Sequence, residues 1–196
     1  MLKEFQAIGR DLFVAGLNSS HSGNLSVRLG DQVVITRRGS MLGHLQERDM
    51  IETGLEKNDS NIILASTEVR VHRAIYRGTA SLAIVHSHPP HAIALSLMED
   101  EIIPVDSEGA YLLHKVPVLF AEHTIGSQEL ENKLPILLQE YKVVMVRGHG
   151  SFAIGQMLEE AYQWTSSLES ACRIIYLTRT LKGDSQESRT GKYKAW

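Results

Sequence analysis

Apolar residues at the start of the chain recur at the spacing of an α-helix. One face of that helix carries Leu2, Phe5, Ile8, Leu12 and Phe13. The pattern ends near Gly16. Residues 18–24 then form a stretch rich in Ser, Gly and Asn, which is typical of a loop.

Short apolar runs bounded by turn residues predict the strands. Residues 25–29 and 32–36 form two such runs, and the turn pair Gly30-Asp31 joins them. The polar, Gly-containing segment 37–40 follows as a second loop. Further strands are expected at 49–53, 81–87, 102–105, 116–121, 142–146 and 152–154.

Four later segments have features of helices. The hydroxyls of Ser66 and Thr67 can cap a helix, and the Pro89-Pro90 pair suits the first turn of another that runs to about Met98. The others are expected at 127–140, where Pro135 is a candidate kink, and at 158–181. This order of elements predicts one α/β domain over residues 1–182, a three-layer α/β/α fold with a mixed, largely antiparallel central sheet. Residues 183–196 are polar and are expected to form a mobile tail.

Composition narrows the classes of function. Of 196 residues, 43% are hydrophobic and 22% charged, which is ordinary for a globular domain, and the formal net charge is −3. No basic stripe is present to bind nucleic acid, although a small anionic ligand needs only a few local donors. The apolar runs are too short to span a membrane, and the N-terminus carries early charges without an apolar signal core, so we expect a cytoplasmic protein. Cys172 is the only cysteine and is read as a packed small residue.

Three histidines form a candidate metal site. Side chains alternate along a strand, so His86 and His88 point to the same side and can provide two ligands of a tetrahedral zinc site. His149 lies between two glycines at a strand end, where a functional side chain is easily presented. The chain has nine histidines, however, and a His-x-His pair alone is more often a pair of surface or hydrogen-bonded histidines than a metal site. His72 could lie behind the metal ligands or simply pack in the core. His91 could line the mouth of the site or have no part in it.

Five short motifs add a resemblance to these observations. They are Gly-Asn-Leu-Ser at 23–26, Ile-Thr-Arg-Arg-Gly at 35–39, Ser-Thr-Glu at 66–68, Val-His-Ser-His-Pro-Pro at 85–90 and Arg-Gly-His-Gly at 147–150. Their order and spacing, from about Leu2 to Leu181, resemble those of the class II aldolase/adducin family, and within it the fuculose-1-phosphate aldolases.

The resemblance implies a function and a set of site residues. It implies one zinc ion per subunit, bound by His86, His88 and His149, with Glu68 as a further ligand and as general acid/base. It implies a sugar-phosphate substrate and a homotetramer with active sites at subunit interfaces. The implied anion pocket consists of Gly23, Asn24, Arg38, Gly39, Ser66 and Thr67. Simple helix capping by Ser66 and Thr67, and a turn role for Asn24, remain alternative interpretations.

The chain departs from the family pattern at two places. The anion loop usually reads Thr-Pro-Ser/Thr-Gly, whereas residues 36–39 read Thr-Arg-Arg-Gly. The aldehyde-side tyrosine of the fuculose enzymes has no counterpart in residues 104–109. Candidate replacements are Asp106, Glu108 and Tyr111, which are equally compatible with an exposed loop, and Tyr193 in the tail.

Other functions share the same scaffold. A sugar-phosphate epimerase or a methylthioribulose-1-phosphate dehydratase would use the same metal ligands. An adducin-like interaction module without catalytic activity need not keep those ligands. The full set of Glu68 and three histidines therefore favours an enzyme.

Overall fold

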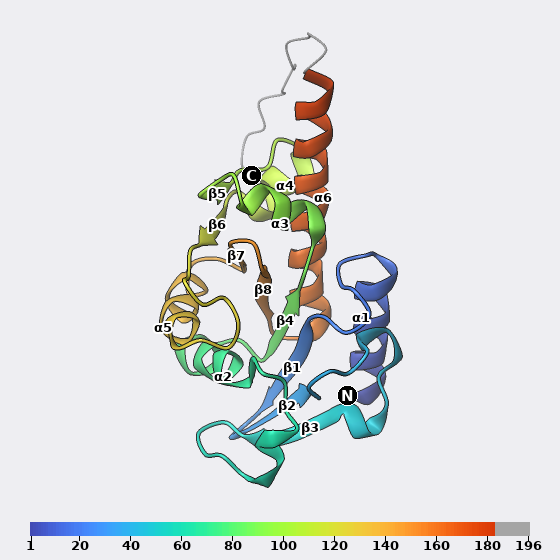
Figure 1. Ribbon diagram of the computed structural model, residues 1–196, viewed down its shortest axis with the longest axis vertical. Coiled ribbons are helices and arrows are strands. Elements are labelled where there is room, and N and C mark those ends of the chain that lie inside the picture. Colours follow the sequence, from blue (N-terminus) through green and yellow to red (C-terminus); the bar gives the residue numbers. More distant parts are fainter. Residues whose placement is uncertain (183–196) are drawn as a thin grey trace.

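A single eight-stranded sheet forms the centre of the molecule (Figure 1). The computed structural model describes residues 1–182; residues 183–196, including Tyr193, lie outside the described part. The strand order is β3-β2-β1-β4-β8-β7-β6-β5, and the β6–β7 pair is parallel whereas the other neighbouring pairs are antiparallel. The strands are β1 (Asn24–Leu29), β2 (Gln32–Thr36), β3 (Met50–Gly54), β4 (Ala83–Ser87), β5 (Glu101–Ile102), β6 (Val116–Leu119), β7 (Val143–Val146) and β8 (Gly150–Gly155).

Helices cover both faces of this sheet. The first face packs against α1 (Leu2–Val14), α3 (Pro90–Ser96), α4 (Ser107–Leu113) and the long α6 (Leu158–Lys182). The second face packs against α2 (Val69–Gly78) and α5 (Gln128–Leu137). Figure 1 shows these two layers on opposite sides of the sheet. Short 3₁₀ turns occur at Leu42–His44, Glu47–Asp49 and Ser60–Ile63. The predicted three-layer fold with a mixed, largely antiparallel sheet is confirmed.

The alternation of side chains along β4 explains both the core and the site. Val85 faces the first layer, where it belongs to one apolar cluster with residues of α1 and α6. Ile84 faces the second layer and packs with residues of α2 and α5. His86 follows Ile84 at the spacing of two and therefore lies on the second face. Ser87 turns back to the first layer, where its hydroxyl lies 2.6 Å from Oγ1 of Thr165 in α6.

One predicted strand was wrong and one helix was not predicted. The strand expected at 102–105 consists only of Glu101–Ile102. Residues 107–113, for which no helix was expected, form α4. The carboxylate of Asp106 caps this helix by accepting from the Gly109 N–H at 2.9 Å. Only Gly109 and Leu113 of α4 are buried, so seven residues carry too little apolar periodicity to be recognised as a helix. Pro135 lies within α5 and does not end it.

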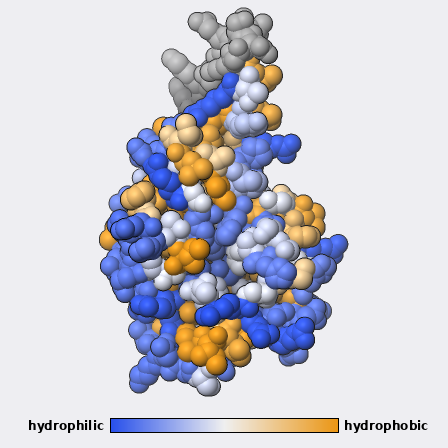
Figure 2. All heavy atoms as spheres, viewed as in Figure 1, coloured by the Kyte–Doolittle hydropathy of each residue, from blue (hydrophilic) through white to orange (hydrophobic). Residues whose placement is uncertain are grey.

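Apolar side chains are exposed at the end of the molecule that carries α3, α4 and the C-terminal half of α6 (Figure 2). They are Leu97, Met98, Ile103, Val105, Leu177 and Leu181. Exposed apolar groups of this extent often mark an interface. Among residues 1–182, no helix combines the length and the apolar character that a membrane span requires.

Candidate metal centre

The end of β4 places the histidine pair. His86 lies directly opposite Asn24 of β1 on one side and Phe152 of β8 on the other. His88 follows the last residue of the strand, and its backbone N–H donates to the carbonyl of Leu17 at 2.8 Å and to Oδ1 of Asn18 at 2.9 Å. Both histidines are therefore held by backbone pairing and not only by their side chains.

His149 reaches the pair from the turn between β7 and β8. Gly148 adopts a φ of +67°, in the left-handed region that glycine tolerates, and the N–H of His149 closes the turn on the carbonyl of Val146 at 3.0 Å. Gly150 allows the close approach of the two segments, because a Cβ there would lie 2.4 Å from the Ser87 carbonyl oxygen. The two glycines around His149 thus have separate structural roles.

The three imidazoles form one compact group. One potential ligand nitrogen from each of His86, His88 and His149 lies within 4.8 Å of the others. The Nε2 atoms of His86 and His88 are 3.1 Å apart. Zinc–nitrogen bonds of about 2.0–2.1 Å in a tetrahedral site would place neighbouring nitrogens ~3.3 Å apart. The three nitrogen donors, and the spacing of the His86–His88 pair, fit a divalent metal ion such as zinc.

The protonation of these histidines also suits a metal. A carbonyl can only accept, so Nδ1 of His86 donates its proton to the Ser151 carbonyl at 2.9 Å, which leaves the Nε2 lone pair free. Burial, together with the neighbouring histidines, lowers the pKa of His88 to about 4 and that of His86 well below its usual value. Burial also lowers the pKa of His149, with partial opposition from the Thr124 backbone. All three are therefore neutral near pH 7, the form that binds metals.

Glu68 occupies the position just before α2 and is 2% exposed. Its carboxylate accepts from the backbone N–H of Gly126, at 3.1 Å to Oε1 and 3.2 Å to Oε2. Burial raises its pKa to about 7, and this hydrogen bond opposes the increase. Glu68 does not belong to the compact group of three histidines. A carboxyl group with this pKa can hold or release a proton at neutral pH.

The residues expected to bind phosphate lie in two places. Gly23 and Asn24 are next to His86: a Cβ on Gly23 would lie 2.6 Å from the His86 carbonyl oxygen, and Oδ1 of Asn24 is buried without a hydrogen-bond partner among residues 1–182.

The second group joins two loops. The N–H of Arg38 donates to the Leu64 carbonyl at 2.9 Å, and the N–H of Ser66 donates to the Thr36 carbonyl at 3.2 Å, so these strand-like segments run side by side. The Ser66 hydroxyl accepts from the Glu68 N–H at 3.2 Å and closes a turn just before α2, while Arg38, Gly39 and Thr67 are exposed. No side chain among residues 1–182 caps α2, so the expected capping by Ser66 and Thr67 is not observed, and phosphate binding by these residues stays a prediction.

Two other histidines have structural contacts. His72 is fully buried, with Nδ1 2.7 Å from the Ser26 hydroxyl, and its ring meets the edge of Phe152 behind His86. Burial lowers the pKa of His72 to about 3. Nδ1 of His91 lies 2.6 Å from the carboxylate of Glu169 in α6. His72 therefore packs in the layer behind the centre.

Sequence reasoning missed two supports of the centre. Asn18, 5% exposed, holds the His88 backbone, although its stretch was interpreted only as a loop. Gly126, 58 residues beyond Glu68, supplies the donor to the Glu68 carboxylate. No local pattern links either residue to its partner. Of the candidate aldehyde-side residues, Asp106 caps α4 and Tyr111 is 61% exposed.

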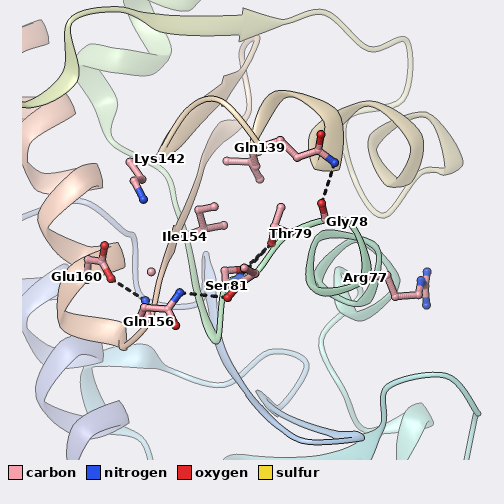
Figure 3. Close-up of a pocket in the computed structure, with 12 residues that line it drawn as sticks. Arg77, Gly78, Thr79, Ser81, Gln139, Lys142, Ile154, Gln156 and Glu160 are labelled. Carbon is pink, nitrogen blue, oxygen red and sulfur yellow. Dashed lines mark hydrogen bonds between the residues drawn. The ribbon is translucent and has the colours of Figure 1, made fainter.

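A separate pocket of about 540 Å³ lies at the opposite ends of β4 and β8 (Figure 3). Ser81, Ile154 and Gly155 line it, whereas His86 and Gly150 lie at the other ends of the same strands. Figure 3 shows Lys142 and Glu160 on one side of this pocket and Arg77 on the other. The pocket is distinct from the histidine centre.

Comparisons with known proteins agree with this geometry. Residues 3–176 match the model of the Class II Aldolase and Adducin N-terminal domain. The L-fuculose phosphate aldolase of Methanocaldococcus jannaschii is 30% identical over 183 residues, which cover 92% of this chain and 98% of that protein. The crystal structure of L-fuculose-1-phosphate aldolase from Thermus thermophilus superposes with a TM-score of 0.89 at 34% identity, covering 95% of this chain and 98% of that one. The 3-oxo-tetronate 4-phosphate decarboxylase of Pectobacterium atrosepticum is also 30% identical, over 181 residues that cover 89% of this chain and 83% of that protein.

Proposed function

Because this chain belongs to the class II aldolase and adducin family, we propose that it is a zinc-dependent aldolase acting on a sugar phosphate. It reversibly cleaves a ketose 1-phosphate, similar to L-fuculose 1-phosphate, into dihydroxyacetone phosphate and an aldehyde. The observation that carries the proposal is the compact group of three neutral imidazoles, His86, His88 and His149, together with the buried carboxyl group of Glu68. The metal site argues against an adducin-like module without catalytic activity.

The chemistry requires stabilisation of negative charge. Cleaving the carbon–carbon bond beside a carbonyl leaves an electron pair that must spread onto the carbonyl oxygen. Zinc held by the three imidazoles would act as a Lewis acid toward the substrate oxygens. Three uncharged ligands leave the full positive charge of the ion available for this role.

Glu68 is the group that moves the proton. Its burial and its pKa of about 7 support a carboxylate that takes or returns a proton at neutral pH. In cleavage, protonation occurs at the carbon that becomes part of dihydroxyacetone phosphate; in the reverse direction, Glu68 removes that proton. We further propose that, in the absence of substrate, the Glu68 carboxylate would serve as a fourth ligand of the ion beside the three imidazoles.

Phosphate binding orients the substrate toward the histidines. The exposed Arg38 guanidinium, Gly39 and the Thr67 hydroxyl supply donors, and Ser66 and Gly23 complete the pocket. The unpartnered Oδ1 of Asn24, directly beside His86, can accept from a ligand hydroxyl at the metal end. Holding the remote phosphate fixes the reacting atoms and lowers the entropic barrier.

The quaternary state completes the proposal. We propose a cytoplasmic homotetramer with one zinc ion per subunit. The exposed apolar residues after α3 and in the C-terminal half of α6 support an interface at that end of the molecule. Light scattering after size-exclusion chromatography would give four times the mass of one chain, and a monomer at micromolar concentration would contradict this.

Decarboxylation is the second candidate, because a relative at 30% identity is a 3-oxo-tetronate 4-phosphate decarboxylase. Loss of carbon dioxide beside a carbonyl leaves the same kind of electron pair as aldol cleavage, so the same metal and phosphate sites serve both reactions. The reactions of epimerases and dehydratases on this scaffold also begin at a carbon beside a carbonyl group. These reactions differ from aldol cleavage in their products.

The decisive experiment is a product assay with purified protein. Dihydroxyacetone phosphate is incubated with a panel of aldehydes, with and without a chelator, and the consumption of dihydroxyacetone phosphate is followed. Metal-dependent condensation with at least one aldehyde is expected. A parallel reaction with a 3-oxo acid phosphate measures carbon dioxide. Release of carbon dioxide without any condensation would identify the protein as a decarboxylase. A purified protein that binds no metal and shows neither activity would favour the interaction module.

A further inference from the structure

The Glu68 carboxylate has one donor in the described structure. Both oxygens accept from the backbone N–H of Gly126, at 3.1 Å and 3.2 Å. Within residues 1–182, no other hydrogen bond and no ion pair reaches this carboxylate, although it is almost fully buried. Its orientation therefore depends on where that single backbone group lies.

Gly126 is itself fixed from two directions. Its φ is +56°, and a Cβ there would lie 2.9 Å from the carbonyl oxygen of Thr67, the residue before Glu68. The next residue, Ser127, caps α5 by accepting from the Leu130 N–H at 3.2 Å. The N–H is thus carried by a segment that packs directly against the backbone of Thr67, next to Glu68.

The carboxylate held in this way lies outside the group of three imidazoles. Among residues 1–182, the group of potential metal ligands consists of His86, His88 and His149, whose ligand atoms lie within 4.8 Å of one another, and Glu68 is not part of it. A carboxylate bound to a cation shares its lone pair with the metal and is a poor base, whereas one hydrogen-bonded to an amide keeps lone pairs free for a proton. The two positions of Glu68 therefore compete.

We propose that Gly126 is a positioning residue whose backbone N–H holds the Glu68 carboxylate apart from the three imidazoles, ready for proton transfer. This inference rests on the proposed function, because it assigns the proton transfer to Glu68. It adds a residue from a different segment to the centre and predicts an effect on metal affinity as well as on turnover.

The first test is Gly126→Ala, compared with Gly30→Ala. Both glycines have a positive φ, +56° and +61°, but nothing lies within 4 Å of a Cβ at Gly30, in the β1–β2 turn far from Glu68. Gly30→Ala therefore reports the cost of alanine at such a φ by itself. For Gly126→Ala we expect kcat to fall about 10- to 100-fold, with KM nearly unchanged.

Zinc affinity distinguishes a loss of Glu68 positioning from a general disruption of the metal centre. A Glu68 released from Gly126 is free to bind the ion, so competition with a chromogenic chelator should show equal or tighter zinc binding in Gly126→Ala. An unchanged kcat, or a loss of zinc affinity in step with the loss of turnover, would overturn the proposal.

A second measurement does not depend on the folding of Gly126→Ala. Amide hydrogen exchange at Gly126 is compared in Glu68→Gln, which keeps an acceptor oxygen, and Glu68→Ala, which removes it. Faster exchange in Glu68→Ala is expected, and equal rates in the two variants would contradict the hydrogen bond. Neither exchange nor zinc affinity requires a substrate, so a protein without aldolase activity can still support or refute this contact.

Discussion

The ring of His86 is stacked on the ring of Phe152, with centroids 4.2 Å apart and planes 19° apart. The two residues face each other on β4 and β8, and Phe152 is fully buried. The imidazole is therefore fixed on its flat side by an aromatic ring and at Nδ1 by the Ser151 carbonyl. This arrangement leaves only Nε2 free for a ligand.

Phe152→Leu should loosen the histidine while preserving the fold. We expect the free energy of unfolding to fall by about 1–1.5 kcal/mol and zinc affinity to fall several-fold, because the ring of His86 loses its flat support. Denaturant unfolding and chelator competition measure the two effects. Phe120→Leu, at an exposed position, is the matched control and should change neither. Normal zinc affinity in Phe152→Leu would show that Ser151 alone orients the imidazole.

Glu68→Gln should separate metal binding from chemistry. The three histidines remain, so zinc content should stay near one ion per chain, while turnover falls roughly 10²- to 10⁴-fold with the loss of general acid/base catalysis. Metal analysis and a cleavage assay provide the readouts. Glu140→Gln, an exposed carboxylate, is the control. Full activity of Glu68→Gln would refute the assigned role.

Acid should destabilise the metal-free protein through His72. Its folded pKa is about 3, below the ordinary value of 6.5, so below pH 6.5 the unfolded chain binds a proton that the folded chain excludes. Stability is then present above pH 6.5 and is lost as the pH falls toward 3, by about 1.4 kcal/mol per pH unit for one such group.

The measurement is denaturant unfolding of metal-free protein at several pH values. His86 and His88 have lowered pKa values and add to the slope, so His72→Gln should reduce the slope without abolishing it. The exposed His44→Gln should leave it unchanged. An identical slope in His72→Gln and the unmodified protein would exclude His72 as a contributor.

Arg38→Ala should act on binding of the phosphorylated substrate. Loss of charge-assisted hydrogen bonds to phosphate is expected to raise KM about 10- to 100-fold, with a smaller change in kcat. Steady-state kinetics at two ionic strengths measure the effect, which should shrink at high salt. Lys142→Ala removes a cation from the pocket at the far ends of β4 and β8 and should leave KM unchanged. Equal effects of the two substitutions would show that Arg38 acts through the overall charge of the protein and not through direct contact with the phosphate.

Much of the local structure was predictable because it depends on neighbours in the chain. Alternation along 83–87 places His86 on the opposite side from Val85, and hydroxyl residues before an amphipathic segment predict the start of α2. The short α4 was not predictable, because its helix depends on capping by Asp106 and on packing against α6 more than on periodicity. Five motifs in order were enough to suggest the family, since each preserves residue types that a local backbone shape and a ligand require.

The assembly of the centre depended on the tertiary structure. His149 and His86 are far apart in the sequence, and the β4–β8 pairing, with glycine at 150, brings the two together. Asn18 supports His88, and Gly126 supports Glu68, through hydrogen bonds whose partners are likewise distant along the chain. Such contacts follow from the order of the strands in the sheet and from the loops that close over the strand ends. Residue patterns within one segment cannot predict the strand order or the loop positions.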